Sequence, residues 1–68
     1  MEFSFVIEEH IGKIGPEKNG WQMELNRVAY NGRPAKFDLR SWNGDHSKMS
    51  KGITLTNEEF EQLRELLR

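Results

Sequence analysis

Three side chains with complementary chemistry alternate along residues 36–42. Lys36 and Arg40 carry positive charge, and Trp42 carries a large aromatic plane. In a β-strand, residues two apart point to the same side at intervals of about 7 Å, so a strand here would place all three on one polar face. Cations at this spacing can follow a phosphate backbone, and an aromatic plane among them can stack on an unpaired base. The pattern therefore predicts binding of a single-stranded nucleic acid.

The charge of the chain is distributed unevenly, although its total is only −1. Residues 18–54 hold seven basic residues against three acidic ones, whereas both ends are net acidic. A polyanion responds to the local potential, so the basic middle is a candidate binding surface. Asp38 lies between Lys36 and Arg40, however, and pairing with either would weaken that surface. Charge and spacing alone support a protein–protein adaptor about as well as a nucleic-acid binder.

Hydrophobic alternation and turn residues divide the chain into four strands. The expected strands cover residues 3–14, 21–30, 36–42 and 53–55, with loops over residues 15–20 and 43–52. In the second strand the apolar parity changes, which predicts a β-bulge or bend near Asn26–Arg27. Such a bend suits a strongly curved sheet.

One helix is expected after the last strand. Thr56 can accept a hydrogen bond as its N-cap, and Glu59 three residues later completes a capping box. A helix of about twelve residues is marginal alone, so it must pack on the sheet. The predicted class is α+β with the order β-β-β-β-α in one domain, residues 1–68. Its expected core consists of Phe37, Leu39, Ile53, Leu55, Phe60 and Leu63.

Association with a second copy is expected because the chain is short. A domain of this length buries only about 60% of the surface that its unfolded chain exposes, and the sequence has no cysteine for disulfides. The apolar stripe of the helix extends to the end of the chain, which leaves apolar surface for a partner. The candidate residues of a homodimer interface are Leu63, Leu66 and Leu67.

Catalytic and cofactor motifs are missing from the sequence. It contains no phosphate-binding glycine loop, and no set of residues suggests a metal site or a catalytic triad. His46 beside Asp45 is interpreted as a solvated loop histidine, and the helix acids as a solvated face. We expect a non-enzymatic protein without cofactor, metal or small-molecule substrate. The first residues predict neither a membrane span nor a signal peptide. A cytoplasmic location, including association with the nucleoid, is expected.

The residues from the third strand onward resemble a known family. The run AKFDLRSWNGDHSKMSKGITLTNEEFEQL is similar to the positive cofactor 4-type transcriptional coactivators, especially their small bacterial YdbC-like branch. The preceding GWQMELNRVAYNG resembles the strand before it in that branch. The resemblance covers roughly residues 20–66. It implies a curved four-stranded antiparallel sheet with one C-terminal helix, a homodimer, and paired grooves for single-stranded DNA.

The resemblance also implies which residues contact the DNA, and that binding depends little on base sequence. They are Lys36, Arg40, Trp42, Lys48 and Lys51, followed by Arg27 and Trp21. The stacking role predicts that Trp42→Ala weakens binding by about 1–3 kcal/mol while the fold survives. Gly52 is expected to let the preceding loop turn tightly into Ile53. The animal members also carry a basic, serine-rich extension, which we do not expect here. Of the roles of the family, the resemblance therefore implies binding of single-stranded DNA for this chain. An RNA binder and a protein–protein adaptor are the alternatives.

Overall fold

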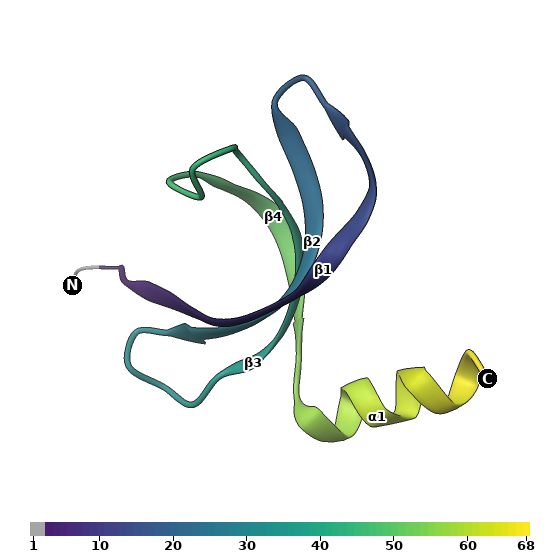
Figure 1. The fold of residues 1–68 in the computed structure, drawn as a ribbon. Helices are drawn as coiled ribbons and strands as arrows, with labels where there is room; N and C mark the ends of the chain where they lie inside the picture. The colour runs from purple at the N-terminus through teal and green to yellow at the C-terminus, as the bar shows by residue number, and fades with distance from the viewer. Residues whose placement is uncertain (1–2) are drawn as a thin grey trace.

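The structure is a computed structural model that describes residues 3–68. They form one four-stranded antiparallel sheet in the order β1-β2-β3-β4, followed by one helix (Figure 1). The elements are β1 Phe5–Lys18, β2 Trp21–Tyr30, β3 Lys36–Trp42, β4 Met49–Leu55 and α1 Asn57–Leu66. The predicted α+β class and the element order are confirmed.

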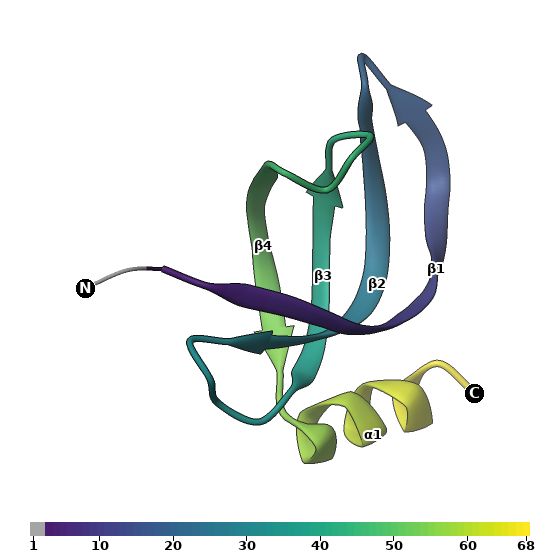
Figure 2. The ribbon, with the colours of Figure 1, turned by 60° about the vertical axis from the view of Figure 1, so that its left-hand side comes forward.

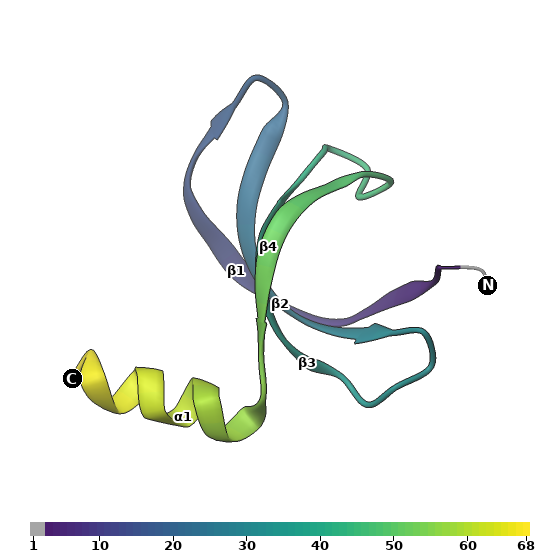
Figure 3. The same cartoon turned by 180° about the vertical axis from the view of Figure 1, so that it is seen from behind.

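The sheet is strongly bent and has two unlike faces. Because side chains alternate along a strand, the registers place Glu24, Asn26, Asp38 and Trp42 on one side, which we call the inner face. The opposite side, the outer face, carries Trp21, Met23, Phe37 and Ile53. Figures 1 and 3 show α1 on one side of the bend, with the N-terminal part of β1 and the β3–β4 loop on the other.

The irregularity expected in β2 lies in its neighbour β1. The β2–β3 register runs without a break from Gln22↔Trp42 to Val28↔Lys36. In β1 the register shifts between Ile7 and Glu9 and again between His10 and Gly12. The prediction of a bulge in β2 at Asn26–Arg27 is therefore wrong. The irregularities lie in β1 instead, on either side of Glu9 and His10, which pair with Arg27 and Asn26. The parity change in β2 arises because apolar side chains lie on both faces of the bent sheet.

The β1–β2 hairpin turn is shorter than the predicted loop over residues 15–20. Asn19 and Gly20 both have positive φ, 52° and 83°, which is the conformation that Asn-Gly favours in a two-residue hairpin. These two residues reverse the chain alone. Residues 15–18 therefore belong to β1, with an irregular register between Ile14 and Lys18.

Gly52 lies inside β4 and not at the end of a loop. The prediction that it turns a loop tightly into Ile53 is therefore wrong, and so is the predicted extent of that loop, residues 43–52. β4 begins at Met49, and Gly52 pairs with Arg40. A Cβ atom at Gly52 would collide with the carbonyl oxygen of Leu39 and the Cβ of Arg40. The missing side chain therefore permits the close approach of β3 and β4.

The core lies on different residues from those predicted. The apolar residues Val28, Ala29 and Trp42 are buried, together with the polar residues Glu24, Asn26 and Asp38. Ile53, expected in the core, is 55% exposed, and the other five predicted core residues are only half-buried. Alternation along a strand identifies which residues share a face, but it does not identify which face is buried. Here the face that carries the polar residues is the more deeply buried one.

The helix begins as predicted. Thr56 accepts from the backbone N–H of Glu59 (3.1 Å), and the Glu59 carboxylate accepts from the backbone N–H of Thr56 (2.8 Å). The ring of Phe60 stacks on Phe37 at 3.8 Å between centroids, which attaches α1 to the outer face. In the part of the chain that the structure describes, no helix has the length and apolar character to cross a membrane.

Candidate nucleic-acid interface

Trp42 is enclosed and not exposed. It shares a face with Arg40, as predicted, but its exposed fraction is 0%. Its ring lies 5.2 Å from Phe5 and 5.5 Å from His46, measured between centroids. A base cannot stack on a ring that is covered in this way. The predicted position of Trp42 on a solvated face is therefore wrong.

Arg40 makes the ion pair that the sequence allowed. Its Nε lies 2.6 Å from Oδ1 of Asp38, whose side chain is fully buried. The Arg40 side chain is itself only 13% exposed, and it also donates to the Ser50 carbonyl at 3.3 Å. The guanidinium is thus engaged within the fold, and little of it faces solvent.

Tyr30 and Thr54 satisfy the second oxygen of the Asp38 carboxylate. The Tyr30 hydroxyl donates to Oδ2 at 3.0 Å, and the Thr54 hydroxyl donates to the same oxygen at 3.2 Å. Burial, together with this hydrogen bond to Asp38, raises the pKa of Tyr30 to about 12. Tyr30 therefore remains a neutral donor near neutral pH.

A second buried carboxylate, Glu24, lies between two histidines. Nε2 of His46 is 2.9 Å from both of its oxygens, and Asn26 donates to Oε1 at 3.1 Å. Nδ1 of His10 is 3.4 Å from the same Oε1. Burial acts to raise the pKa of Glu24, but the hydrogen bonds from His46 and Asn26 and the histidine charges outweigh it and lower this pKa. His46 is therefore a structural partner, and its interpretation as a solvated loop residue is wrong.

The lowered pKa of Glu24 predicts a loss of stability in acid. A carboxyl group whose pKa is lower in the folded state stabilises the fold above its unfolded pKa of about 4.3, and this contribution is lost as the pH falls through the folded value. We expect the difference in unfolding free energy between the wild type and Glu24→Gln to shrink between pH 7 and pH 3. Urea unfolding at a series of pH values measures it. A difference that stays constant across the series contradicts the prediction.

Exposed cations lie near both ends of β3. Lys36 opens the strand, whereas Lys48 lies in the β3–β4 loop and Lys51 in β4, and all three are exposed. Lys36 and the far end of β3 are six residues apart, which corresponds to about 20 Å. Arg33, in the β2–β3 turn, is also exposed and is a further candidate contact that the sequence-based prediction did not include. Its position beside Lys36 in the basic segment was the signal that could have identified it.

The last two predicted contacts, Arg27 and Trp21, lie on the outer face. The Arg27 guanidinium stands 5.6 Å from the Phe37 ring centroid, which holds it beside the helix. Trp21 is 37% exposed, with Met23 and Ile14 each 45% exposed nearby around a small cavity. The structure therefore separates these two residues from Trp42 and Arg40 on the inner face.

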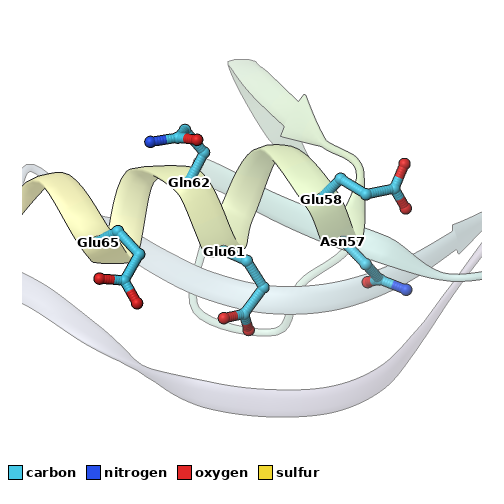
Figure 4. Close-up of a pocket in the computed structure, with 5 residues that line it drawn as sticks. All are labelled: Asn57, Glu58, Glu61, Gln62 and Glu65. Atoms are coloured by element: carbon cyan, nitrogen blue, oxygen red, sulfur yellow. The ribbon is translucent and has the colours of Figure 1, made fainter.

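The helix presents an acidic surface. Glu58, Glu61 and Glu65 lie along it with Asn57 and Gln62 (Figure 4). This surface would repel a phosphate backbone, so the exposed lysines near β3 are the better site for a polyanion. Within residues 3–68, no cluster of three or more His, Cys, Asp or Glu side chains could hold a metal ion.

A bent four-stranded sheet with exposed lysines near β3 and one acidic, capped helix defines the class: a small α+β module with a cationic surface. Residues 17–66 match the family model described as Transcriptional Coactivator p15 (PC4). The chain therefore belongs to this family, as the resemblance predicted. It is also 44% identical over 66 residues to a protein of Treponema pallidum (strain Nichols) that is described as an uncharacterized protein; the match covers 97% of this chain and 78% of that relative.

Proposed function

We propose that this protein binds single-stranded DNA without sequence preference, as a homodimer and without catalysis, in support of transcription, replication or repair in the cytoplasm. Membership of the p15 (PC4) coactivator family is the observation that carries this proposal. The exposed lysines near both ends of β3 supply phosphate contacts that any base sequence can use.

A single strand fits this surface better than a duplex does. The helix is acidic on its exposed side, so it is unsuited to entering a major groove. Lys36 lies on β3, Lys51 on β4, and Lys48 in the loop that joins these strands. A flexible backbone can follow positions spread in this way. Phosphate contacts of this kind position the ligand and carry no sequence information.

The homodimer is supported by apolar side chains that the single chain leaves uncovered. Leu66 and Leu67 at the end of α1 are 73% and 77% exposed. Leu63, one turn earlier, is half-buried. On the outer face, Met23 and Ile53 are 45% and 55% exposed. Exposed apolar surface of this kind marks interaction sites. A second copy that covered the helix end and the part of the outer face around Met23 would leave Lys36, on the inner face, free.

The lysine contacts predict a loss of affinity on charge reversal. We expect the triple variant Lys36→Glu/Lys48→Glu/Lys51→Glu to weaken binding of labelled oligo-dT at least about tenfold and to flatten the salt dependence. Fluorescence anisotropy at two salt concentrations measures both effects. A matched control, Lys18→Glu/Arg64→Glu/Arg68→Glu, changes the net charge equally at exposed positions elsewhere.

Three outcomes count against the proposal. Equal losses in the two triple variants would indicate general charge attraction and not a site. Equal or tighter binding of a duplex of the same length would contradict single-strand preference. Tighter binding of an RNA strand of the same sequence and length would indicate that RNA, and not DNA, is the preferred ligand.

A further inference from the structure

The first residues of β1 and the last residues of β2 form a two-stranded ribbon. Phe5 pairs with Tyr30, and Ile7 pairs with Val28. The pairing of β2 with β3 stops at Val28↔Lys36, so Ala29 and Tyr30 continue past β3 with only β1 beside them. We call residues 5–7 and 28–30 the N-terminal ribbon. In Figure 2 its β1 strand passes across β3 and β4.

The ribbon covers Trp42 with an aromatic ring. Phe5 lies 5.2 Å from the Trp42 ring at an interplanar angle of 49°. Phe3 lies 6.1 Å from Phe5 and 5.9 Å from Tyr30, so the aromatic contacts continue outward along the ribbon. His46 also lies beside the Trp42 ring, 5.5 Å away between centroids. Phe5 therefore occupies a place beside Trp42 that a stacked base would need.

The covered conformation leaves a polar atom unsatisfied. The indole Nε1 of Trp42 is buried and has no hydrogen-bond partner among residues 3–68. A buried donor without a partner destabilises the conformation that contains it, and an indole N–H normally finds a partner when it is buried. Exposure of Trp42 to a nucleotide, whose base and phosphate carry acceptors, would satisfy this donor.

The β1 strand of the ribbon, residues 5–7, is the part that can move. The two register shifts of β1, at Ile7/Glu9 and His10/Gly12, lie where the ribbon joins the rest of the sheet. In this strand Val6 is 60% exposed and Phe5 and Ile7 are only half-buried, whereas Val28 and Ala29 of the β2 strand are buried in the core. Segments with few buried apolar contacts open at low free energy.

We propose that the β1 strand of the N-terminal ribbon, residues 5–7, gates a base-stacking site on Trp42, with Phe5 in the place of the base when the gate is closed. This inference rests on the proposed binding of single-stranded DNA and adds its regulation. Because only the open fraction binds at this position, the closed ribbon lowers the apparent affinity by that fraction. Removal of the Phe5 ring raises the open fraction.

The test uses Trp42 as a single fluorophore in a Trp21→Phe background. In this background we expect Phe5→Ala to increase oligo-dT affinity severalfold and to increase acrylamide quenching of Trp42. We expect added oligo-dT to quench Trp42 emission directly by stacking. Val6→Ala, in the same ribbon but on an exposed side chain, is the control and should leave both measurements unchanged. Phe5→Leu keeps apolar volume without the aromatic plane and replaces Phe5→Ala if that variant fails to fold by circular dichroism.

The outcomes separate the gate from the binding function. If oligo-dT binds but Trp42 stays shielded and neither Phe5 variant gains affinity, the gate is overturned and the binding function stands. If the parent protein and all variants fail to bind any single strand, the binding function fails and the gate fails with it. A gain in affinity for Val6→Ala equal to that for Phe5→Ala would also overturn the gate, since general loosening of the ribbon would then explain it.

Discussion

Trp42→Ala is expected to lower the free energy of unfolding by about 3–5 kcal/mol, the range for removing a large aromatic side chain from a core. The Trp42 ring is fully buried and is the largest such side chain. It joins parts of the chain that are far apart in sequence, since it contacts Phe5 of β1 and His46 of the β3–β4 loop. In a domain of 68 residues, a loss of this size removes most of the stability that such a chain has.

Urea unfolding followed by circular dichroism measures this loss, because the signal does not depend on the tryptophan that is removed. Protein concentration is held equal, since association contributes to apparent stability. Trp21→Ala is the matched control: it deletes the same side chain where 37% of the residue is exposed, so we expect a loss well below that for Trp42→Ala. Equal losses at the two positions would show that Trp42 is not a core residue in solution.

This result changes how a stacking role of Trp42 can be tested. The sequence-based expectation was that Trp42→Ala weakens DNA binding while the fold survives. Because the ring is buried, we now expect Trp42→Ala to destabilise the fold as well, so lost affinity in this variant would follow from unfolding. The Phe5 variants avoid this problem because they change what covers the ring and leave the ring in place.

Local patterns predicted the elements because local interactions determine them. Alternation in residues 36–42 predicts β3, and the strand has those bounds. The capping box of Thr56 and Glu59 fixes the start of α1 through two hydrogen bonds over three residues. Asn19-Gly20 was sufficient for the hairpin turn, and the longer loop was expected only because Gly-Pro precedes it.

The buried side of the sheet could not be predicted in the same way. Glu24, Asn26 and Asp38 are polar, so their alternation indicated a solvated face, although each is buried with hydrogen-bond partners. Those partners come from distant positions: His46 reaches Glu24 across 22 residues. No short-range pattern records such a contact. For the same reason the basic residue types of the candidate site were visible in the sequence, whereas the enclosure of Arg40 and Trp42 was not.

Asp38→Ala is the second prediction with a large expected effect. Asp38 is fully buried and accepts from Arg40 at 2.6 Å, from Tyr30 at 3.0 Å and from Thr54 at 3.2 Å. Its removal leaves the Arg40 charge, 13% exposed, without its carboxylate and two hydroxyl donors without their acceptor. Breaking a buried ion pair from one side costs about 3–5 kcal/mol, so we expect a loss of that size in urea unfolding. Glu61→Ala, which removes a carboxylate from an exposed pair with Arg64, should change stability by less than about 1 kcal/mol.

A double-mutant cycle separates the Arg40 charge from the rest of the network. Arg40→Met keeps an unbranched apolar stem and removes the charge, so Asp38→Ala/Arg40→Met should be more stable than Asp38→Ala alone. If the double variant is no more stable, the unpaired charge is not the source of the loss, and the hydrogen bonds of Tyr30 and Thr54 must account for it. The same variants locate the role of Arg40 in DNA binding. A residue that acts mainly by holding Asp38 should lose oligo-dT affinity only in proportion to the folded fraction, whereas a direct phosphate contact should also reduce the salt dependence of binding by the folded protein.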